Sequence, residues 1–326
     1  MAELDITERR VDLDGRFQVN YRTGDGQAWT IDVRISIIPG PAGEDVVMRI
    51  LDRAQLILEL DRLGFQDQQL QAYNDMIHSP GGMVLAVGTS GSGKTTTLYA
   101  AINRINHEKI KILTAEDPIE FNFKKVNQKQ VNDHMGFADY SRAFLRQDPD
   151  VIMIGEIRDP ETATISVRAA NTGHLVMSTL HTGNAVMAIS RMRSLGVDDD
   201  YMADVLRGIV SQRLVRIICD HCKKEVDPPE KLIRKFYDSR PGHAFYRGQG
   251  CEKCDETGYI GRTGVFEVLT TDDELREMIT KGVPTGMIRR ELLSGDFQPL
   301  YKHALKKVEH GITSLTDVAR VIMAPD

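Results

Sequence analysis

Residues 83–95 of the chain read Met-Val-Leu-Ala-Val-Gly-Thr-Ser-Gly-Ser-Gly-Lys-Thr, and this stretch decides the fold. The apolar run at 83–87 predicts a buried strand, and the pattern at 94–105 predicts a helix. Between them, Gly88 to Thr95 matches the phosphate-loop pattern G-x-x-x-x-G-K-[ST] at every fixed position. Because strand, loop and helix follow one another in the order that phosphate binding needs, we interpret the match as a nucleotide site.

The residue types in this loop predict how it holds a nucleoside triphosphate. Glycines let backbone N–H groups wrap the phosphates, and the start of the helix adds the positive end of its dipole. Lys94 is expected to contact the β- and γ-phosphates, and the Thr95 hydroxyl is expected to bind Mg²⁺. The expected ligands are therefore ATP and Mg²⁺, and the expected phosphate-binding residues are Ser90, Gly91, Ser92, Gly93, Lys94, Thr95 and Thr96.

Outward from the loop, predicted strands and helices alternate along the chain. Further strands are expected at 110–113, 151–154 and 175–180, and further helices at 66–78, 138–147, 161–170 and 185–194. Such alternation predicts an α/β fold of the RecA-like type, with a parallel sheet covered by helices on both faces. We expect four parts: a small β-rich N-terminal domain (1–62), the RecA-like core (63–215), a cysteine-containing module (216–262) and a helical C-terminal region (263–326).

The composition limits the functional classes. The 326 residues are 41% hydrophobic and 27% charged, which is typical of a globular protein, and the net charge of −6 disfavours a globally basic nucleic-acid binder. No apolar run approaches the ~18 residues that cross a bilayer. The acidic N-terminus also lacks the apolar segment of a signal peptide, so we expect a cytoplasmic protein.

The four cysteines of the chain form two C-x-x-C pairs, Cys219 with Cys222 and Cys251 with Cys254. In a reducing cytosol this spacing indicates a metal site before it indicates disulfides. Four thiolates leave no open coordination position, so a structural Zn²⁺ is expected. The alternatives are free or redox-active thiols, and His221 inside the first pair offers a competing ligand.

Two acidic segments follow predicted strands. Glu156 comes after the strand at 151–154, with Gly155 at the position where phosphate-loop proteins usually have Asp, and we expect Glu156 to serve the metal through water. Glu116 is expected to polarise the attacking water, whereas Asp117, before Pro118, could instead cap a turn. The alternative for both glutamates is a structural or solvated acid.

Two histidines flank the predicted strand at 175–180. His174 and His181 are seven residues apart, which places them on opposite faces of a regular strand and indicates different roles. We expect His181, at the C-terminal end, to sense the γ-phosphate. His174 is expected to be structural or to lie at an interface.

Taken together, the motifs resemble the secretion ATPase superfamily of type II secretion and type IV pilus assembly, the GspE/PilB group. Four blocks carry the resemblance: the phosphate loop, the acidic block at 114–120, the Walker B-like block at 145–159 and the histidine block at 173–182. The family shares the Gly155-Glu156 feature, and assembly-type members share the four cysteines. The resemblance covers essentially the whole chain.

The resemblance implies a homo-hexameric ring that hydrolyses ATP to power type IV pilus assembly, with type II secretion as the alternative. It implies that Arg34 and Arg49 approach the phosphates, where the residues alone indicate strand arginines on a solvated face. Arg146 and Arg213 are further candidates to act in trans. The implied partner is an inner-membrane platform protein, so membrane association is peripheral, at the cytoplasmic face and only through partners. Family members usually carry a further upstream domain, and we expect a truncation here.

Two other classes compete with this interpretation. One is a nucleic-acid-dependent ATPase with a zinc ribbon, but the chain has one tryptophan and no aromatic-basic stretch, so no nucleic-acid partner is expected. The other is an ATP-binding scaffold without turnover, which Lys94, Glu116 and Glu156 argue against. A modest basic cluster is expected to be a solvated helix face; it comprises Lys223, Lys224, Lys231, Arg234 and Lys235.

Overall fold

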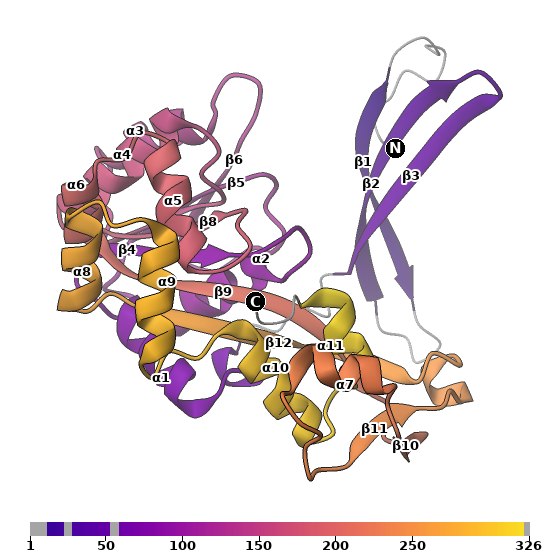
Figure 1. Cartoon of the computed structure of the whole chain (residues 1–326). Coiled ribbons are helices and arrows are strands. Elements are labelled where there is room, and N and C mark those ends of the chain that lie inside the picture. Colours follow the sequence, from indigo (N-terminus) through magenta and orange to yellow (C-terminus); the bar gives the residue numbers. More distant parts are fainter. Residues whose placement is uncertain (1–11, 23–27, 53–58, 323–326) are drawn as a thin grey trace. The chain divides into compact units, whose positions relative to one another are not determined.

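A computed structural model describes residues 12–22, 28–52 and 59–322 of the chain (Figure 1). The chain divides into two compact units, Met1–Ile57 with Ile119–Asn122, and Leu58–Pro118 with Phe123–Asp326. The predicted boundaries at residues 62, 215 and 262 stay predictions.

The first unit contains a three-stranded antiparallel sheet with the order β1-β2-β3. Its strands are β1 (Leu13–Arg22), β2 (Ala28–Gly40) and β3 (Gly43–Asp52). Gly40 pairs with Gly43 across a two-residue connection, and Gly43 has a φ of +139°, which a residue with a Cβ rarely adopts. The predicted β-rich N-terminal part is therefore a simple meander.

The second unit is built on a seven-stranded sheet with the order β12-β9-β4-β8-β7-β5-β6. The strands are β4 (Gly82–Val87), β5 (Ile112–Glu116), β6 (Val126–Gln130), β7 (Val151–Ile154), β8 (Leu175–Leu180), β9 (Leu206–Ile218) and β12 (Tyr259–Thr270). All neighbouring pairs are parallel apart from β12 with β9. This arrangement confirms the predicted α/β fold with a parallel sheet.

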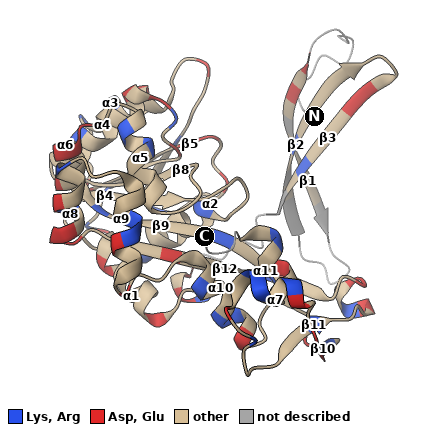
Figure 2. Ribbon diagram, in the orientation of Figure 1, with Lys and Arg blue, Asp and Glu red and all other residues tan. Residues whose placement is uncertain are grey.

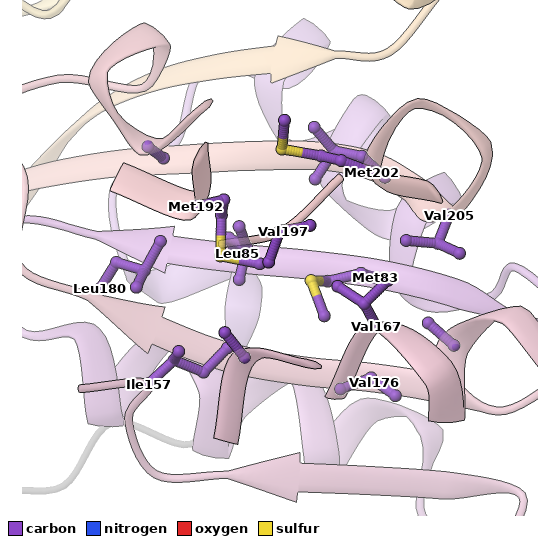
Figure 3. Close-up of a cluster of buried hydrophobic side chains, with 14 of the residues drawn as sticks. Met83, Leu85, Ile157, Val167, Val176, Leu180, Met192, Val197, Met202 and Val205 are labelled. Atoms are coloured by element: carbon purple, nitrogen blue, oxygen red, sulfur yellow. The ribbon is translucent and has the colours of Figure 1, made fainter. Parts of the chain in front are cut away.

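Six helices contribute most of the cover of this sheet among the described residues (Figure 1). They are α1 (Asp67–Ile77), α2 (Lys94–Ile105), α3 (Phe137–Phe144), α4 (Pro160–Asn171), α5 (Val186–Ser194) and α6 (Asp199–Val205). On one face, Met83, Leu85 and Val87 of β4 join a buried cluster with residues of α4, α5 and α6 (Figure 3). The alternate β4 residues, Val84 and Ala86, are also buried, as expected for a strand with helices on both faces.

Two long strands at the edge of the sheet were not predicted from the sequence. β9 and β12 pair antiparallel from Gly208 with Thr270 to Arg216 with Arg262, and we call this pair the β9–β12 ribbon. Its far end carries the four cysteines. The segment between the two strands holds β10 (Lys223–Val226), α7 (Glu230–Phe236), β11 (Phe245–Gly248) and the 3₁₀ turn η3 (Glu252–Cys254).

The C-terminal region is helical, as predicted, and its helices join two different cores. They are α8 (Asp273–Thr280), α9 (Thr285–Ser294), α10 (Leu300–Glu309) and α11 (Leu315–Val321). Leu275 and Ile279 of α8 and Ile288 of α9 belong to the large cluster of the sheet. In contrast, α10 and α11 pack with α7 and the ribbon in a separate cluster that contains Val215 and Val265.

An ion pair between a buried carboxylate and a partly exposed guanidinium attaches α11 to the ribbon. The Asp317 side chain has no exposed surface, and it accepts hydrogen bonds from the backbone N–H and the Nε of Arg216 at 2.7 and 2.8 Å. The Arg216 guanidinium also lies 4.0 Å from the centre of the Tyr259 ring. Because Asp317 is removed from water, its contacts to Arg216 replace its hydration.

We therefore expect Asp317→Ala to lower the free energy of unfolding by about 2 kcal/mol, since the backbone N–H and the partly exposed guanidinium of Arg216 both lose a charged hydrogen-bond acceptor. Urea unfolding followed by circular dichroism measures this change. The matched control is Glu230→Ala, which removes the exposed pair with Arg234 at 3.1 Å and should change stability by less than about 1 kcal/mol. Equal effects of the two variants would contradict the role given to Asp317.

Candidate nucleotide site and metal centre

The phosphate loop connects β4 to α2 and has an unusual backbone. Gly88, Gly91 and Gly93 have φ values of +155°, +72° and +90°, in the region that favours glycine. Gly93 is the N-cap residue of α2, so Lys94 and Thr95 open the first turn of the helix. The N–H groups of this turn have no partner within the helix, which makes the turn suited to an anion.

Lys94 is buried at the base of this loop. Its Nζ donates to the carbonyl oxygens of Gly88 at 3.0 Å and Thr89 at 3.2 Å. Burial, and second the nearby Arg213 charge, lower the pKa of Lys94 to about 8. The hydrogen bonds of this ammonium group among the described residues go to two backbone carbonyls, so a phosphate oxygen would be a strong additional partner.

Glu116, at the end of β5, is 3% exposed and is surrounded by neutral donors. The hydroxyls of Tyr99 and Thr114 donate to its two carboxylate oxygens, and Gln128 Nε2 donates at 3.0 Å. These donors fix the orientation of the carboxylate. Because each carboxylate oxygen can accept two hydrogen bonds, Glu116 still has acceptor capacity for a further group.

Glu156 and His181 meet although they are 25 residues apart in the chain. His181 Nε2 lies 3.2 Å from one oxygen of Glu156, and Arg158 contacts the other. The Glu156 side chain is 13% exposed, whereas that of His181 is 50% exposed. Partial burial, then the charges of Lys94 and Arg158, lower the pKa of His181, so a neutral imidazole faces Glu156 at pH 7.

The glycine that replaces the usual aspartate has a packing reason. A Cβ on Gly155 would lie 3.1 Å from the carbonyl oxygen of Ala115 and 3.2 Å from a ring carbon of Phe137. The N–H of Gly155 also donates to that same carbonyl at 2.8 Å. A side chain at this position would therefore require these neighbours to move by a few tenths of an ångström, and Glu156 is the acid at the strand end.

Other predicted residues lie apart from this group. His174 is at the opposite end of β8 from His181, and its Nδ1 lies 2.9 Å from the carbonyl oxygen of Ala169, which fits a structural role. Arg146 is exposed, with a weak 3.3 Å bond to the carbonyl of Arg142. In the first unit, Arg34 of β2 and Arg49 of β3 are cross-strand partners, so the register places them side by side on one face of that sheet.

Two residues of β9, Gln212 and Arg213, lie next to the phosphate loop. Only Arg213 was a candidate from the sequence. Gln212 is 1% exposed, and its Nε2 donates to the carbonyl oxygen of Ser92 at 2.7 Å. Arg213, which was a candidate to act in trans, donates within its own chain to the carbonyls of Gln212 and Gly183. No sequence motif marks Gln212, because its importance depends on the pairing of β9 with β4.

The four cysteine sulfurs form a compact cluster at the end of the ribbon. All four Sγ atoms lie within 4.8 Å of one another, with measured separations of 3.9 Å (Cys219 to Cys251), 3.8 Å (Cys222 to Cys254) and 3.7 Å (Cys251 to Cys254). A tetrahedron with Zn–S bonds of about 2.3 Å has edges of about 3.8 Å, so the donor set fits Zn²⁺.

Backbone groups support negative charge on one of these sulfurs, that of Cys254, whereas burial raises the pKa of Cys222 and Cys251. The N–H groups of Cys251 and Gly258 donate to Cys254 Sγ at 3.3 and 3.2 Å. Burial acts to raise the pKa of Cys254, but the bonds from Gly258 and Cys251 outweigh it and lower the pKa to about 7. His221 is exposed and does not belong to the cluster, so the described residues present four thiolate ligands and no histidine.

Basic and acidic residues are interspersed along the helices and strands of the described residues (Figure 2). Helix α7 carries three basic residues and one acidic residue, Glu230, which pairs with Arg234 at 3.1 Å. Among the helices that the structure describes, none is both long and apolar enough to span a bilayer.

Comparison with known proteins identifies the family. The family model for type II/IV secretion system proteins matches residues 1–320. The type II secretion system ATPase E of Vibrio cholerae is 45% identical over 98% of this chain, and the type IV pilus assembly ATPase PilB of Myxococcus xanthus is 42% identical over 98%. This chain spans 63% and 56% of the length of these two relatives.

Comparison with a solved structure supports the same family assignment. The crystal structure of the pilus retraction motor PilT with bound ADP aligns with 97% of this chain and 78% of its own, with 28% identity and a TM-score of 0.67. The chain therefore belongs to the family of type II/IV secretion system proteins.

Proposed function

We propose that the chain is an ATP-hydrolysing motor that powers type IV pilus assembly, with pseudopilus assembly in type II secretion as the alternative. One observation carries the enzymatic part: the phosphate loop with its buried Lys94 shares a sheet edge with the Glu156–His181 pair. The two alternatives rest on relatives of similar identity, 45% for the secretion ATPase and 42% for the pilus ATPase.

In the proposed reaction, the loop and the first turn of α2 bind the triphosphate. Lys94 extends its contacts from the carbonyls of Gly88 and Thr89 to the β- and γ-phosphates. The Thr95 hydroxyl would hold Mg²⁺, which neutralises phosphate charge when bound. The phosphate-binding N–H groups are those of residues 90–96.

The acids complete the site from neighbouring strands. Glu116, oriented by Tyr99, Thr114 and Gln128, is the proposed base that polarises the attacking water. Glu156 would organise Mg²⁺ and the attacking water. His181, whose Nε2 lies 3.2 Å from a Glu156 oxygen, is proposed to sense the γ-phosphate. The contacts of Glu116 and Glu156 to neighbouring residues hold both groups in fixed orientations before the nucleotide arrives.

The proposed assembly is a homo-hexamer at the cytoplasmic face of the inner membrane. Arg34 and Arg49, side by side on one sheet face, are proposed to approach the phosphates and stabilise the charge of the transferring phosphoryl group. The proposed partner is an inner-membrane platform protein, which ATP-driven movements of the ring would push. Zn²⁺ on the four cysteines is the proposed structural metal.

A nucleic-acid-dependent ATPase remains the rival class, and a salt titration distinguishes it. Stimulation of ATP hydrolysis by single-stranded DNA that disappears at high salt would favour the rival.

We expect Glu156→Gln to retain nucleotide binding and to lower kcat at least 100-fold, because the amide keeps the shape but loses the charge that organises metal and water. ATP turnover and equilibrium binding of fluorescent ADP measure the two effects. Glu108→Gln is the control, since it removes an exposed acid whose partner is Lys125. Normal hydrolysis by Glu156→Gln would refute the role of this acid.

The two histidines that flank β8 provide a matched pair of variants. His181→Ala should lower kcat roughly tenfold, because Glu156 loses a hydrogen-bond partner next to the phosphates. His174→Ala, at the other end of the same strand, should leave kcat within about twofold. Comparable losses in both variants would mean that the strand, and not the Glu156 contact, determines the rate.

Metal content tests the cysteine cluster. Cys219→Ser should release Zn²⁺ and lower the thermal stability, because metal binding supplies part of the folding energy of such a site. His221→Ala should retain one Zn²⁺ per chain, since His221 lies outside the cluster. Elemental analysis of purified protein measures both, and unchanged zinc in Cys219→Ser would exclude a tetrathiolate site.

A further inference from the structure

Gln212 is a fully buried polar residue that no sequence motif explains. It lies on β9 one residue after Ser211, which pairs with Val87 at the end of β4. This register brings Gln212 to the point where the chain leaves β4 to form the phosphate loop. Its side-chain amide then donates to the carbonyl oxygen of Ser92 at 2.7 Å, on the far side of the loop.

Both ends of the loop close onto this residue. A Cβ on Gly88 would lie 2.7 Å from the backbone oxygen of Gln212, and a Cβ on Gly93 would lie 3.0 Å from its Nε2. These distances are shorter than ordinary contacts of a Cβ, so the loop can take this path only with glycine at both positions. Gln212 therefore lies against both ends of the loop, with its backbone oxygen at Gly88 and its side-chain amide at Gly93.

Two buried polar atoms at this position have no hydrogen-bond partner among the described residues: Gln212 Oε1 and Ser92 Oγ. An unsatisfied buried acceptor is costly, and native structures keep such groups where function needs them. A hydrophobic residue of similar size would avoid this cost. The presence of glutamine thus indicates that the bond from Nε2 to Ser92 matters.

Arg213 links the same point to the histidine segment. Its guanidinium donates to the carbonyl of Gln212 at 2.9 Å and to that of Gly183 at 3.2 Å, two residues after His181. The buried Glu267 of β12 lies near this arginine and accepts hydrogen bonds from the N–H groups of Ala185 and Leu300 at 2.8 and 3.1 Å. The segment after His181 is therefore held by β9 on one side and β12 on the other.

We propose that Gln212 is a positioning residue for the nucleotide, which holds the phosphate loop in its anion-binding conformation through Ser92, while Arg213 fixes the segment after His181 to the same strand. This inference rests on the proposed ATPase function. Gln212 acts through the loop backbone, so its loss weakens nucleotide binding and leaves the reacting groups Glu116 and Glu156 in place.

The chain offers a matched control for Gln212. Gln69 on α1 is also buried, and its Nε2 donates to a backbone carbonyl of the same ribbon, that of Phe266, at 2.9 Å. Gln212→Met and Gln69→Met thus each remove one buried amide-to-carbonyl bond with little change in volume, and Gln69→Met also removes the bond that Gln69 Oε1 accepts from the N–H of Gln66 at 3.2 Å. Only the first bond involves the phosphate loop.

The test measures the Kd for Mg-ADP and the kcat and KM for ATP in purified wild type and both variants. We expect Gln212→Met to raise Kd and KM about tenfold with kcat within about threefold, a pattern that loss of uniform binding gives. Gln69→Met should leave all three within about twofold while lowering thermal stability by a comparable amount. A wild type that neither binds Mg-ADP nor hydrolyses ATP would refute the proposed function itself.

Other outcomes overturn the inference alone. Wild-type Kd in folded Gln212→Met, or equal loss of affinity in both variants, would remove the special role of Gln212. If Gln212→Met fails to fold, Gln212→Asn, one methylene too short to reach Ser92, repeats the test. Unfolding of both Gln212 variants under conditions where Gln69→Met folds would assign the residue to the fold and overturn the proposal.

Arg213 is tested against Arg207 at the other end of β9, which donates to the carbonyls of Gly81 and Asp204 at 2.8 and 3.0 Å. Arg213→Met should lower kcat/KM at least fivefold, whereas Arg207→Met should change it less than twofold. Equal effects would mean that any arginine bonded along β9 has the same influence, and would overturn the link to the histidine segment.

Discussion

The candidate nucleotide site depends on one close contact, that of the phosphate loop with β9. Gly88 and Gly93 approach Gln212 so closely that a Cβ at either position would have to displace backbone or amide atoms. This contact fixes the loop, the loop fixes the start of α2, and α2 carries Lys94 and Thr95. The backbone path of the loop therefore requires both the glycines and the edge strand on which they pack.

The direction of the strands explains why distant residues converge. β4, β5, β7 and β8 are parallel, so their C-terminal ends meet at one edge of the sheet, where Glu116 ends β5 and where Lys94, Glu156 and His181 follow β4, β7 and β8. His174 belongs to the other end of β8 and is excluded from this edge by the same geometry. The direction of β8 thus places His181 at the candidate site and His174 away from it.

Much of the core could be predicted from sequence because its signals are local. Apolar runs bounded by glycines marked β4, β7 and β8, and the phosphate loop and the cysteine spacing each depend on a few fixed positions. The β9–β12 ribbon was not predicted from the sequence because its strands mix apolar residues with Gln212, Arg213 and Glu267. The environment of these polar residues depends on partners far away in the chain. The contacts of Glu116 with Tyr99 and Gln128 could not be predicted either, because these residues are also distant from Glu116 in the chain.

The ribbon also relates the metal centre to the nucleotide site. Cys219 follows β9 directly, seven residues after Gln212, which corresponds to about 23 Å along a strand. A charge effect over that distance is screened by salt, so the metal cannot tune the phosphates directly. The cysteine cluster instead holds together the chain segments that follow β9 and precede β12, and thereby limits fraying of the strand pair on which the loop packs. A metal ion on these cysteines would therefore contribute to nucleotide binding only through the stability of the ribbon.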